Sequence, residues 1–134
     1  MDNHQAKTIM MLEPDVLIRM VIAEHLRDCG YRVIEGVAAQ DAWAVLESGR
    51  RIEIVLADVK LAGEEDGFSL ARRIRQTHSD IDVILTSGIA GAAQESHDLC
   101  EEGPIKKPYE ARDVEARIRI MLERRRASRN WSRN

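Results

Sequence analysis

Short apolar runs alternate along this chain with longer segments whose apolar residues recur at helical spacing, and this alternation is what most constrains the fold. The clearest run, IEIVLAD at 52–58, is rich in β-branched and aliphatic residues and predicts a strand buried on both faces. The stretch 16–30 repeats apolar residues at helical spacing and stops at Gly30, which favours a helix. Read in this way, the chain predicts strands at 9–12, 31–36, 52–58, 81–88 and 104–108, and helices at 16–30, 38–49, 68–78, 92–103 and 110–126.

Five strand–helix pairs in succession predict an α/β domain in which a doubly wound parallel sheet carries helices on both faces. The run at 9–12 also permits a short helix, and 104–108 also permits an extended segment. The 134 residues fit one domain, which we expect to cover residues 1–126, followed by a loose basic tail at 127–134. Such sheets bind ligands beyond the carboxyl ends of their strands, and that edge is where we expect a site.

The composition excludes several classes of protein. Hydrophobic residues make up 44% of the chain, but no apolar run approaches the roughly 20 residues that cross a bilayer. The N-terminal MDNHQAKT lacks a signal-peptide segment, so we expect a soluble, cytoplasmic protein with no membrane partner. Residues 117–134 hold seven arginines and one glutamate, whereas the rest of the chain is acidic. An acidic body repels phosphates, so the basic end indicates a solvated helix end rather than a nucleic-acid site.

Polar side chains stand at the ends of four of the five predicted strands, or directly after them. They are Glu13, Asp15, Asp58, Thr86, Ser87 and Lys107. Because the carboxyl ends of parallel strands share one edge, we expect these side chains to surround a common ligand. Carboxylates favour a divalent cation, whereas a hydroxyl and an ammonium suit phosphate oxygens. An aspartate in this setting can act as a nucleophile that accepts a phosphoryl group.

Four segments of the chain resemble the receiver domains of two-component response regulators. IEIVLADVKLAGEEDGFSLARRIR resembles the phosphoacceptor strand and its loop, and VILTSG resembles the threonine-bearing fourth strand. IKKPY resembles the Lys-Pro signature, and MMLEPDVLIR resembles the acidic end of the first strand. The resemblance covers residues 7–126 and implies a flavodoxin-like (βα)5 fold with strand order 2-1-3-4-5.

The resemblance implies a role for each residue at the strand ends. Asp58 would accept a phosphoryl group from a histidine kinase or a phosphotransfer protein. Thr86 would bind a phosphoryl oxygen and shift toward it, and Lys107 would pair with the phosphoryl group. Mg²⁺ would be held by Asp58, by the backbone carbonyl of Lys60 and, through a water, by Glu13.

The chain departs from the family pattern at the metal site. Pro14 stands where the family usually has a second acid, and proline offers no side-chain oxygen. Asp15 either turns toward the metal or caps the first helix, and Pro14 at the entry of that helix favours the cap. The loss of one carboxylate predicts weakened Mg²⁺ binding, because affinity depends on ligand charge and number. The Lys60 side chain either reaches over the pocket or points into water.

The switch positions are also atypical. Pro104 occupies the position where the family often has a tyrosine or phenylalanine that moves together with the threonine, and proline cannot swing between rotamers in that way. Tyr109 is a candidate substitute, although in the family an aromatic residue there is commonly part of the fold. The resemblance also implies a cis peptide bond between Lys107 and Pro108.

The combined prediction is a phosphorylation-switched domain that signals and is not an enzyme. Its output face would comprise the helix at 92–103, the strand after it and the helix at 110–126. This face would bind a downstream protein or a second copy of the chain. The alternating charges of the last helix are compatible with such a homodimer, but they are also typical of any solvent-exposed helix face, which is the interpretation that we favour. We expect no DNA-binding or enzymatic output domain.

The main alternative is a degenerate receiver that binds its partner without phosphorylation. Pro14 and Pro104 favour this alternative, whereas the intact Asp58, Thr86 and Lys107 oppose it. A phosphatase of the haloacid-dehalogenase type would carry a second aspartate where this chain has a lysine. A flavodoxin-like cofactor protein would need glycine, serine or threonine donors after the first strand, and EPDVLI lacks them.

Overall fold

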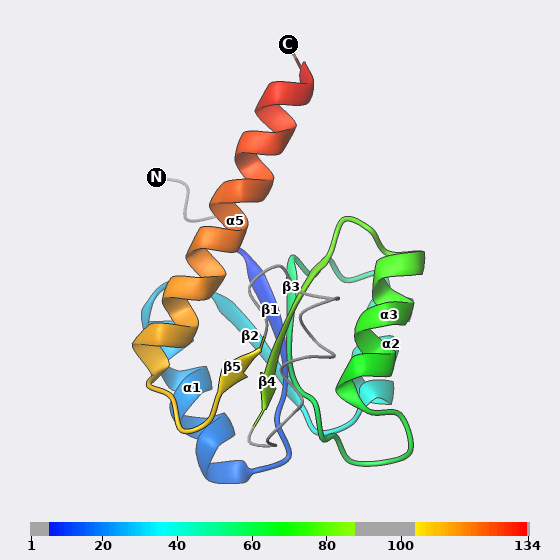
Figure 1. Cartoon of the computed structure of the whole chain (residues 1–134), viewed down its shortest axis with the longest axis vertical. Coiled ribbons are helices and arrows are strands. Elements are labelled where there is room, and N and C mark those ends of the chain that lie inside the picture. The colour runs from blue at the N-terminus through cyan, green and yellow to red at the C-terminus, as the bar shows by residue number, and fades with distance from the viewer. Residues whose placement is uncertain (1–5, 88–103, 134) are drawn as a thin grey trace.

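The computed structural model describes residues 6–87 and 104–133, and these residues form an α/β domain (Figure 1). The strands are β1 (Thr8–Leu12), β2 (Arg32–Gly36), β3 (Ile54–Asp58), β4 (Asp82–Ser87) and β5 (Ile105–Lys106). The helices within the described ranges are α1 (Val16–Asp28), α2 (Ala39–Glu47), α3 (Gly67–Thr77) and α5 (Ala111–Arg133). The helix expected at 92–103 lies outside the described residues.

The five strands form one parallel sheet in the order β2-β1-β3-β4-β5, which confirms the predicted fold. All five residues of β1 and of β3 are buried, as continuous apolar runs predict for central strands covered on both faces. The register pairs Leu12 with Ala57 and Asp58 with Thr86, so the carboxyl ends of β1, β3 and β4 lie at one edge.

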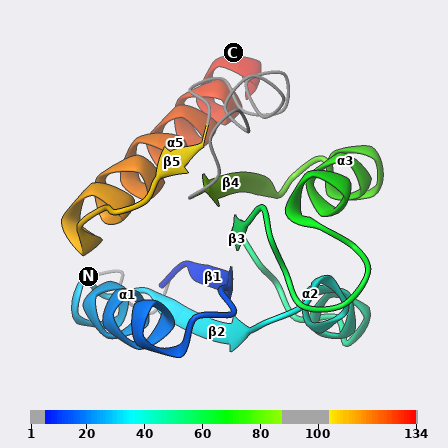
Figure 2. The same ribbon diagram turned by 60° about the horizontal axis from the view of Figure 1, so that its bottom comes forward.

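Helices cover both faces of the sheet, with α1 and α5 on one face and α2 and α3 on the other (Figure 2). Successive residues of a strand point to opposite faces. In β1, Met10 and Leu12 therefore pack with α2 and α3, whereas Ile9 and Met11 pack with α1 and α5. Two aliphatic cores result, one on each side of the sheet.

Local signals in the sequence explain where α1 and α3 begin and where α1 ends. The side chain of Asp15 accepts hydrogen bonds from the backbone of Leu17 and Ile18 at the start of α1. Asp66 caps α3 in the same way by accepting from the amide of Ser69 at 2.8 Å. Gly30, with φ of +100°, follows the end of α1 in a conformation that side chains other than glycine rarely adopt.

Helix α5 is longer than the sequence predicts. Its backbone stays helical to Arg133, whereas a loose tail is predicted from residue 127, and its end projects beyond the sheet (Figure 1). The prediction was wrong here because the segment after Pro108 contains no glycine or proline to end the helix. None of the helices in the described parts of the chain has the length and apolar character needed to cross a membrane.

Candidate functional site

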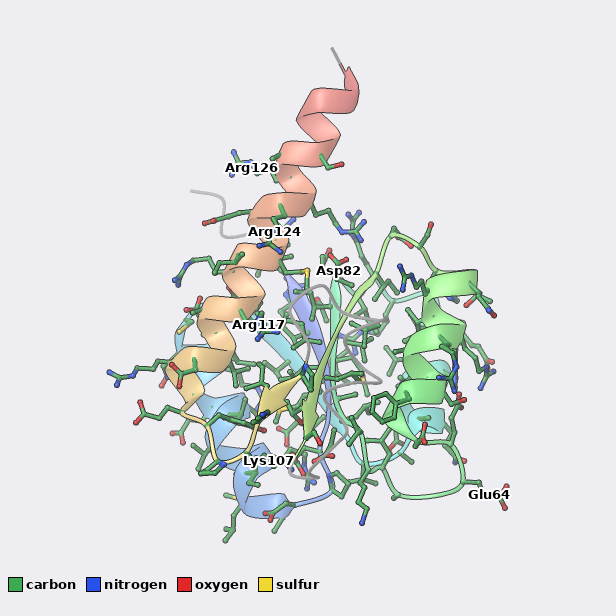
Figure 3. The ribbon with its side chains drawn as sticks, viewed as in Figure 1. Glu64, Asp82, Lys107, Arg117, Arg124 and Arg126 are labelled. Atoms are coloured by element: carbon green, nitrogen blue, oxygen red, sulfur yellow. The ribbon has the colours of Figure 1, made fainter. Side chains whose placement is uncertain are left out.

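The polar residues predicted from the strand ends meet at the carboxyl edge of the sheet. Glu13 directly follows β1, Asp58 is the last residue of β3, Thr86 lies opposite Asp58 in β4, and Lys107 directly follows β5. Figure 3 places Lys107 at this end of the strands. Because the sheet is parallel, its topology alone brings these four positions, which are distant in sequence, to one edge.

Asp58 is buried, with 6% of its surface exposed, and both of its carboxylate oxygens have partners. Its Oδ1 accepts a hydrogen bond of 2.8 Å from the backbone amide of Lys60, and its Oδ2 accepts one from the ammonium of Lys107. The start of α3 packs against the same residue, since a Cβ added to Gly67 would lie 2.5 Å from the Asp58 carbonyl oxygen. The Lys60 amide and the Lys107 ammonium therefore orient the carboxylate, while α3 packs against the backbone of the same residue.

Lys107 bridges the two buried acids of the site. Its Nζ, besides contacting Asp58, lies 2.9 Å from Oε1 of Glu13. Burial lowers the pKa of this amine, but its contacts with Asp58 and Glu13 outweigh burial and raise the pKa above the ordinary value. Lys107 is thus an ammonium at neutral pH, and it lies between the two acidic side chains.

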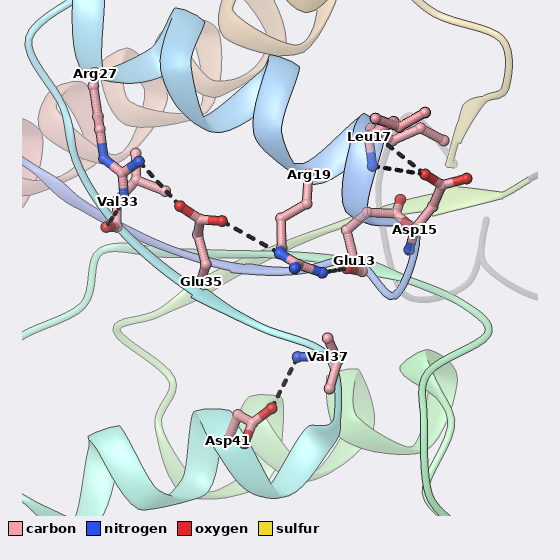
Figure 4. Close-up of polar contacts among 10 residues, drawn as sticks. Glu13, Asp15, Leu17, Arg19, Arg27, Val33, Glu35, Val37 and Asp41 are labelled. Carbon is pink, nitrogen blue, oxygen red and sulfur yellow. Dashed lines mark hydrogen bonds and ion pairs between the residues drawn. The ribbon is translucent and has the colours of Figure 1, made fainter.

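Glu13 is held on a rigid loop between β1 and α1. Its Oε2 accepts a hydrogen bond of 2.9 Å from the amide of Asp15, and its backbone carbonyl accepts one of 2.8 Å from Arg19. Figure 4 shows the Arg19 side chain reaching from Glu35 on β2 to this carbonyl. Among the described residues, Glu13 Oε1 has no hydrogen bond besides its ion pair with Lys107. This buried oxygen and Oδ2 of Asp58 contact the same ammonium.

The acidic cluster is smaller than the family pattern implies. Pro14 is exposed and contributes no oxygen, and Asp15 is exposed and caps α1 with its Oδ1, the role that the sequence analysis favoured. In the described part of the chain, no three acidic, histidine or cysteine side chains are grouped so as to hold a metal. The Lys60 side chain is exposed, in line with the interpretation that it points into water.

Thr86 is almost fully buried, with 2% of its surface exposed, and its side chain lies beside the hydroxyl of Tyr109. Burial raises the pKa of the Tyr109 hydroxyl to about 12, and the negative charge of Glu13 adds to this, whereas the positive charge of Lys107 acts in the opposite direction. Tyr109 thus reaches the edge where the acids lie. Pro104 is half-buried at the start of β5, and the Lys107–Pro108 peptide bond is cis, which confirms the prediction.

Sequence reasoning did not identify two residues that shape this site. Gly67 allows α3 to approach Asp58, and the only signal was its place after Asp66 at the start of a predicted helix. Arg19 supports the Glu13 carbonyl, which a position in the first turns of α1 hints at but does not specify. The position of Tyr109 beside Thr86 depends on the path of the segment between β5 and α5, and no sequence pattern encodes it.

Comparison with known proteins places this architecture in a family. The family model described as "Response regulator receiver domain" matches residues 9–119. The chain is 31% identical over 126 residues to the sensor kinase CckA of Brucella abortus, covering 92% of this chain and 13% of that protein. It is 29% identical to the phosphate regulon transcriptional regulatory protein PhoB of Pseudomonas aeruginosa, covering 88% of this chain and 52% of that protein. The chain thus spans only part of these relatives.

Solved structures agree with this assignment. A crystal structure of NtrX from Brucella abortus in complex with ADP has a TM-score of 0.83 at 27% identity, covering 95% of this chain and 29% of that chain. A response regulator receiver protein from Sinorhizobium medicae has a TM-score of 0.81 at 22% identity, covering 91% and 98%, which supports the fold alone. With the family model spanning most of the chain, the protein belongs to the family of response regulator receiver domains of two-component systems.

Proposed function

We propose that the chain is a phosphorylation-switched receiver in which Asp58 accepts a phosphoryl group from a histidine kinase or a phosphotransfer protein. The observation that carries this proposal is the buried Asp58 carboxylate, which is oriented by the Lys60 amide and contacts the Lys107 ammonium. Receiver domains are signalling modules, so the proposed outcome is a change of partner binding and not the turnover of a substrate.

The residues present can perform the transfer. A carboxylate oxygen of Asp58 would attack the phosphorus of a phosphohistidine, so that a P–O bond forms while the P–N bond breaks and the electron pair leaves with the imidazole nitrogen. The raised pKa of Lys107 keeps its ammonium protonated, and this ammonium would pair with the phosphoryl oxygens. The Thr86 hydroxyl would donate a hydrogen bond to one of them.

Mg²⁺ fits this site only with a reduced set of donors. Glu13, whose Oε1 has no hydrogen bond among the described residues, Asp58 and the backbone carbonyl of Lys60 would hold the ion. The ion would neutralise charge on the group being transferred. Since Pro14 supplies no oxygen and Asp15 is engaged as a cap, we propose weak Mg²⁺ binding, with the Lys107 ammonium providing much of the positive charge.

The output would pass through protein contacts. Helix α5, whose exposed side carries alternating charges, belongs to the expected output face together with the helix at 92–103, which lies outside the described residues. The partner would be a downstream protein or a second copy of the chain. Nucleic acid stays disfavoured, because the basic end of α5 follows an acidic body.

A second candidate function is a receiver fold that binds its partner without phosphorylation. The specific observation in its favour is the incomplete acidic cluster, in which an exposed Pro14 stands beside only two buried carboxylates. In this case the ion pair of Lys107 with Asp58 would be a permanent structural contact.

The two functions are separated by a phosphorylation assay followed by intact mass measurement. The wild type, Asp58→Asn, Pro14→Asp and the uncharged control Pro14→Asn would be incubated with acetyl phosphate over a range of Mg²⁺ concentrations. We expect the wild type to gain one phosphoryl group, Asp58→Asn to gain none, and Pro14→Asp to require less Mg²⁺ than Pro14→Asn. A wild type that gains no mass while Pro14→Asp does would establish the phosphorylation-independent alternative instead.

A further inference from the structure

The loop between β3 and α3, residues 59–66, begins directly after Asp58 and contains Lys60, whose backbone carbonyl is one of the proposed Mg²⁺ ligands. Among the described residues this carbonyl accepts no hydrogen bond, so it is available to a ligand. A backbone carbonyl is a neutral donor, and it helps to bind a cation only where the chain around it is held in place. The contacts that hold this loop therefore bear on the metal site.

The backbone of the loop is fixed at its ends and at one point between them. The Gly67 amide donates a hydrogen bond of 2.9 Å to the Val59 carbonyl and so joins the two ends. The Ala62 amide donates one of 2.9 Å to the Val37 carbonyl, which ties the loop to the segment before α2. The next residue is Gly63, with φ of +84°, and glycine restricts the backbone least of all residues. The outer part of the loop therefore depends on side-chain contacts.

Glu65 supplies such contacts with both of its carboxylate oxygens. Its Oε1 accepts hydrogen bonds from Arg73 at 2.6 Å and from the Trp43 indole at 3.4 Å. Its Oε2 accepts one of 3.1 Å from the Ser69 hydroxyl. The Glu65 side chain is only 20% exposed, although it lies in a surface loop. Glu65 thus links the loop to α2 through Trp43 and to α3 through the other two residues.

Arg73 and Trp43 also contact each other. The guanidinium carbon of Arg73 lies 4.4 Å from the centroid of the Trp43 ring, which is within the range of a cation–π contact. Trp43 in turn packs against the buried core beneath α2 and α3. Glu65, Arg73 and Trp43 therefore form a closed set of three contacts that ties the loop to this core.

We infer that Glu65 is a positioning residue for the metal site, which acts by holding the loop so that the Lys60 carbonyl can bind Mg²⁺. This inference rests on the proposed function, since it concerns the ion that the phosphoryl transfer would use. Because Pro14 supplies no carboxylate, each remaining donor contributes a larger share of the affinity. A loop that is already ordered spares Mg²⁺ binding the entropic cost of ordering it.

The test measures Mg²⁺ binding to the unphosphorylated full chain through the amide resonances of Val59 and Lys60 during a Mg²⁺ titration. Glu65→Ala should weaken Mg²⁺ binding by about tenfold, the lower end of the range for groups that orient metal ligands. Glu65→Gln should weaken it less, because its amide oxygen can still accept from Arg73. Unchanged affinity in a folded Glu65→Ala would overturn the inference, and so would a wild type whose resonances do not respond to Mg²⁺.

The matched control is Glu64→Ala. Glu64 is exposed, and Figure 3 shows its side chain pointing away from the domain at the outer edge of the same loop. Both alanine variants remove one negative charge from this loop, so a long-range attraction between the loop and Mg²⁺ would be lost in both. The affinity of Glu64→Ala should stay within about twofold of the wild type, because exposed charges are screened. An equal loss in Glu64→Ala and Glu65→Ala would show that charge and not position is responsible.

Arg73→Met distinguishes position from charge by the sign of its effect. It removes a positive charge, and by Coulomb attraction alone this would tighten the binding of Mg²⁺. It also removes the 2.6 Å hydrogen bond to Glu65, so the inference predicts weaker binding instead. Tighter or unchanged Mg²⁺ binding in Arg73→Met would refute the role of Glu65 in holding the loop.

A phosphorylation assay separates this inference from the proposed function. With acetyl phosphate, Glu65→Ala should need more Mg²⁺ for half-maximal gain of phosphoryl mass, while its rate at saturating Mg²⁺ stays near that of the wild type. A lower rate at saturating Mg²⁺ with an unchanged Mg²⁺ requirement would contradict a positioning role. If the wild type gains no phosphoryl mass, the proposed function fails, and the Mg²⁺ titration still decides the role of Glu65.

Discussion

Strand β3 has a buried carboxylate at each end, and the two are held in different ways. Glu53, just before the strand, is 7% exposed, and Asp58, its last residue, is 6% exposed. Glu53 accepts hydrogen bonds from the Thr8 amide at 2.7 Å and from Arg51 at 2.8 Å, so a backbone group of the neighbouring strand fixes it. Asp58 instead shares the ammonium of Lys107 with a second buried acid.

The difference between the two ends indicates which carboxylate is available for chemistry. The Glu53 site joins β3 to the start of β1 and pairs with a guanidinium that is itself largely exposed. At the Asp58 site, two buried carboxylates compete for one cation, so a ligand that brings further positive charge or draws the ammonium away changes the whole arrangement. Glu53 and Asp58 are about equally buried, so burial does not show which of them is available for chemistry. Their partners do show it.

The largest expected contrast between the two ends concerns phosphorylation itself. Asp58→Asn should abolish the gain of phosphoryl mass from acetyl phosphate, whereas Glu53→Gln should leave it intact, because its amide oxygen can still accept from Thr8. Intact mass measured under identical conditions checks both variants. Retained phosphorylation in Asp58→Asn, or its loss in a folded Glu53→Gln, would show that the acceptor has been assigned wrongly.

A second contrast concerns the cations. Lys107→Met would leave two buried carboxylates side by side, and we expect the free energy of unfolding at pH 7 to fall by about 3 kcal/mol, the lower end of the range for a broken buried pair. Arg51→Met removes a partner of Glu53 whose side chain is 72% exposed, and it should lower the free energy of unfolding by less than about 1 kcal/mol. Urea denaturation of both variants in Mg²⁺-free buffer measures the difference, and equal losses would contradict the proposed electrostatic role of Lys107.

A third prediction concerns the end of the sheet opposite Asp58, where α5 contacts the start of β4. Arg125 contacts both oxygens of Asp82, at the start of β4, at 2.8 Å, and Figure 3 shows Asp82 at the end of the sheet opposite Lys107. Arg125→Met should lower the free energy of unfolding by about 1.5 kcal/mol, since this is a charged pair with two hydrogen bonds that is partly open to solvent. The exposed neighbour serves as the control, and Arg126→Met should change the same quantity by less than about 0.5 kcal/mol.

Phosphorylation should be unaffected in Arg125→Met, because the pair lies at the opposite edge from Asp58. Intact mass after incubation with acetyl phosphate measures this in the same preparation. A variant that stays folded but no longer accepts a phosphoryl group would mean that the two ends of the sheet are coupled, and the contrast drawn between them would not hold.

The sequence predicts which residues lie at the carboxyl ends of the strands better than it predicts the contacts between their side chains. Hydrophobic runs located β1, β3 and β4, and parallel topology then placed Glu13, Asp58 and Thr86 at one edge. The boundary of β3 shifted, because Glu53 was expected within the strand but precedes it. Which side chain bonds to which is decided by loop paths and packing, so the contact of Thr86 with Tyr109 required coordinates.

The end of α5 is a part of the fold whose extent the sequence analysis did not predict. A loose tail was predicted from residue 127, because the last residues of a domain are often poorly ordered. Helical propensity without a stop signal nevertheless continues the helix, because nothing in ASRNWSR interrupts it. Packing arguments therefore locate the core of this fold but not the length of the helix that leaves it.

The smallest expected effect concerns the pKa values of the two tyrosines of the chain, which lie toward opposite ends of the strands. Burial raises the pKa of both Tyr31 and Tyr109 to about 12, with Glu115 adding to the first and Glu13 to the second. A phenol whose pKa is raised in the folded state binds more protons there than in the unfolded state between about pH 10 and pH 12. The stability that it contributes is therefore complete below about pH 10 and is lost as the pH rises through about 12.

Absorbance of tyrosinate during an alkaline titration measures this directly. The folded wild type should show little tyrosinate at pH 10.5, while protein unfolded in guanidinium ionises near the ordinary pKa of about 10. Tyr31→Phe and Tyr109→Phe should each remove half of the high-pH absorbance change, since the chain has two tyrosines.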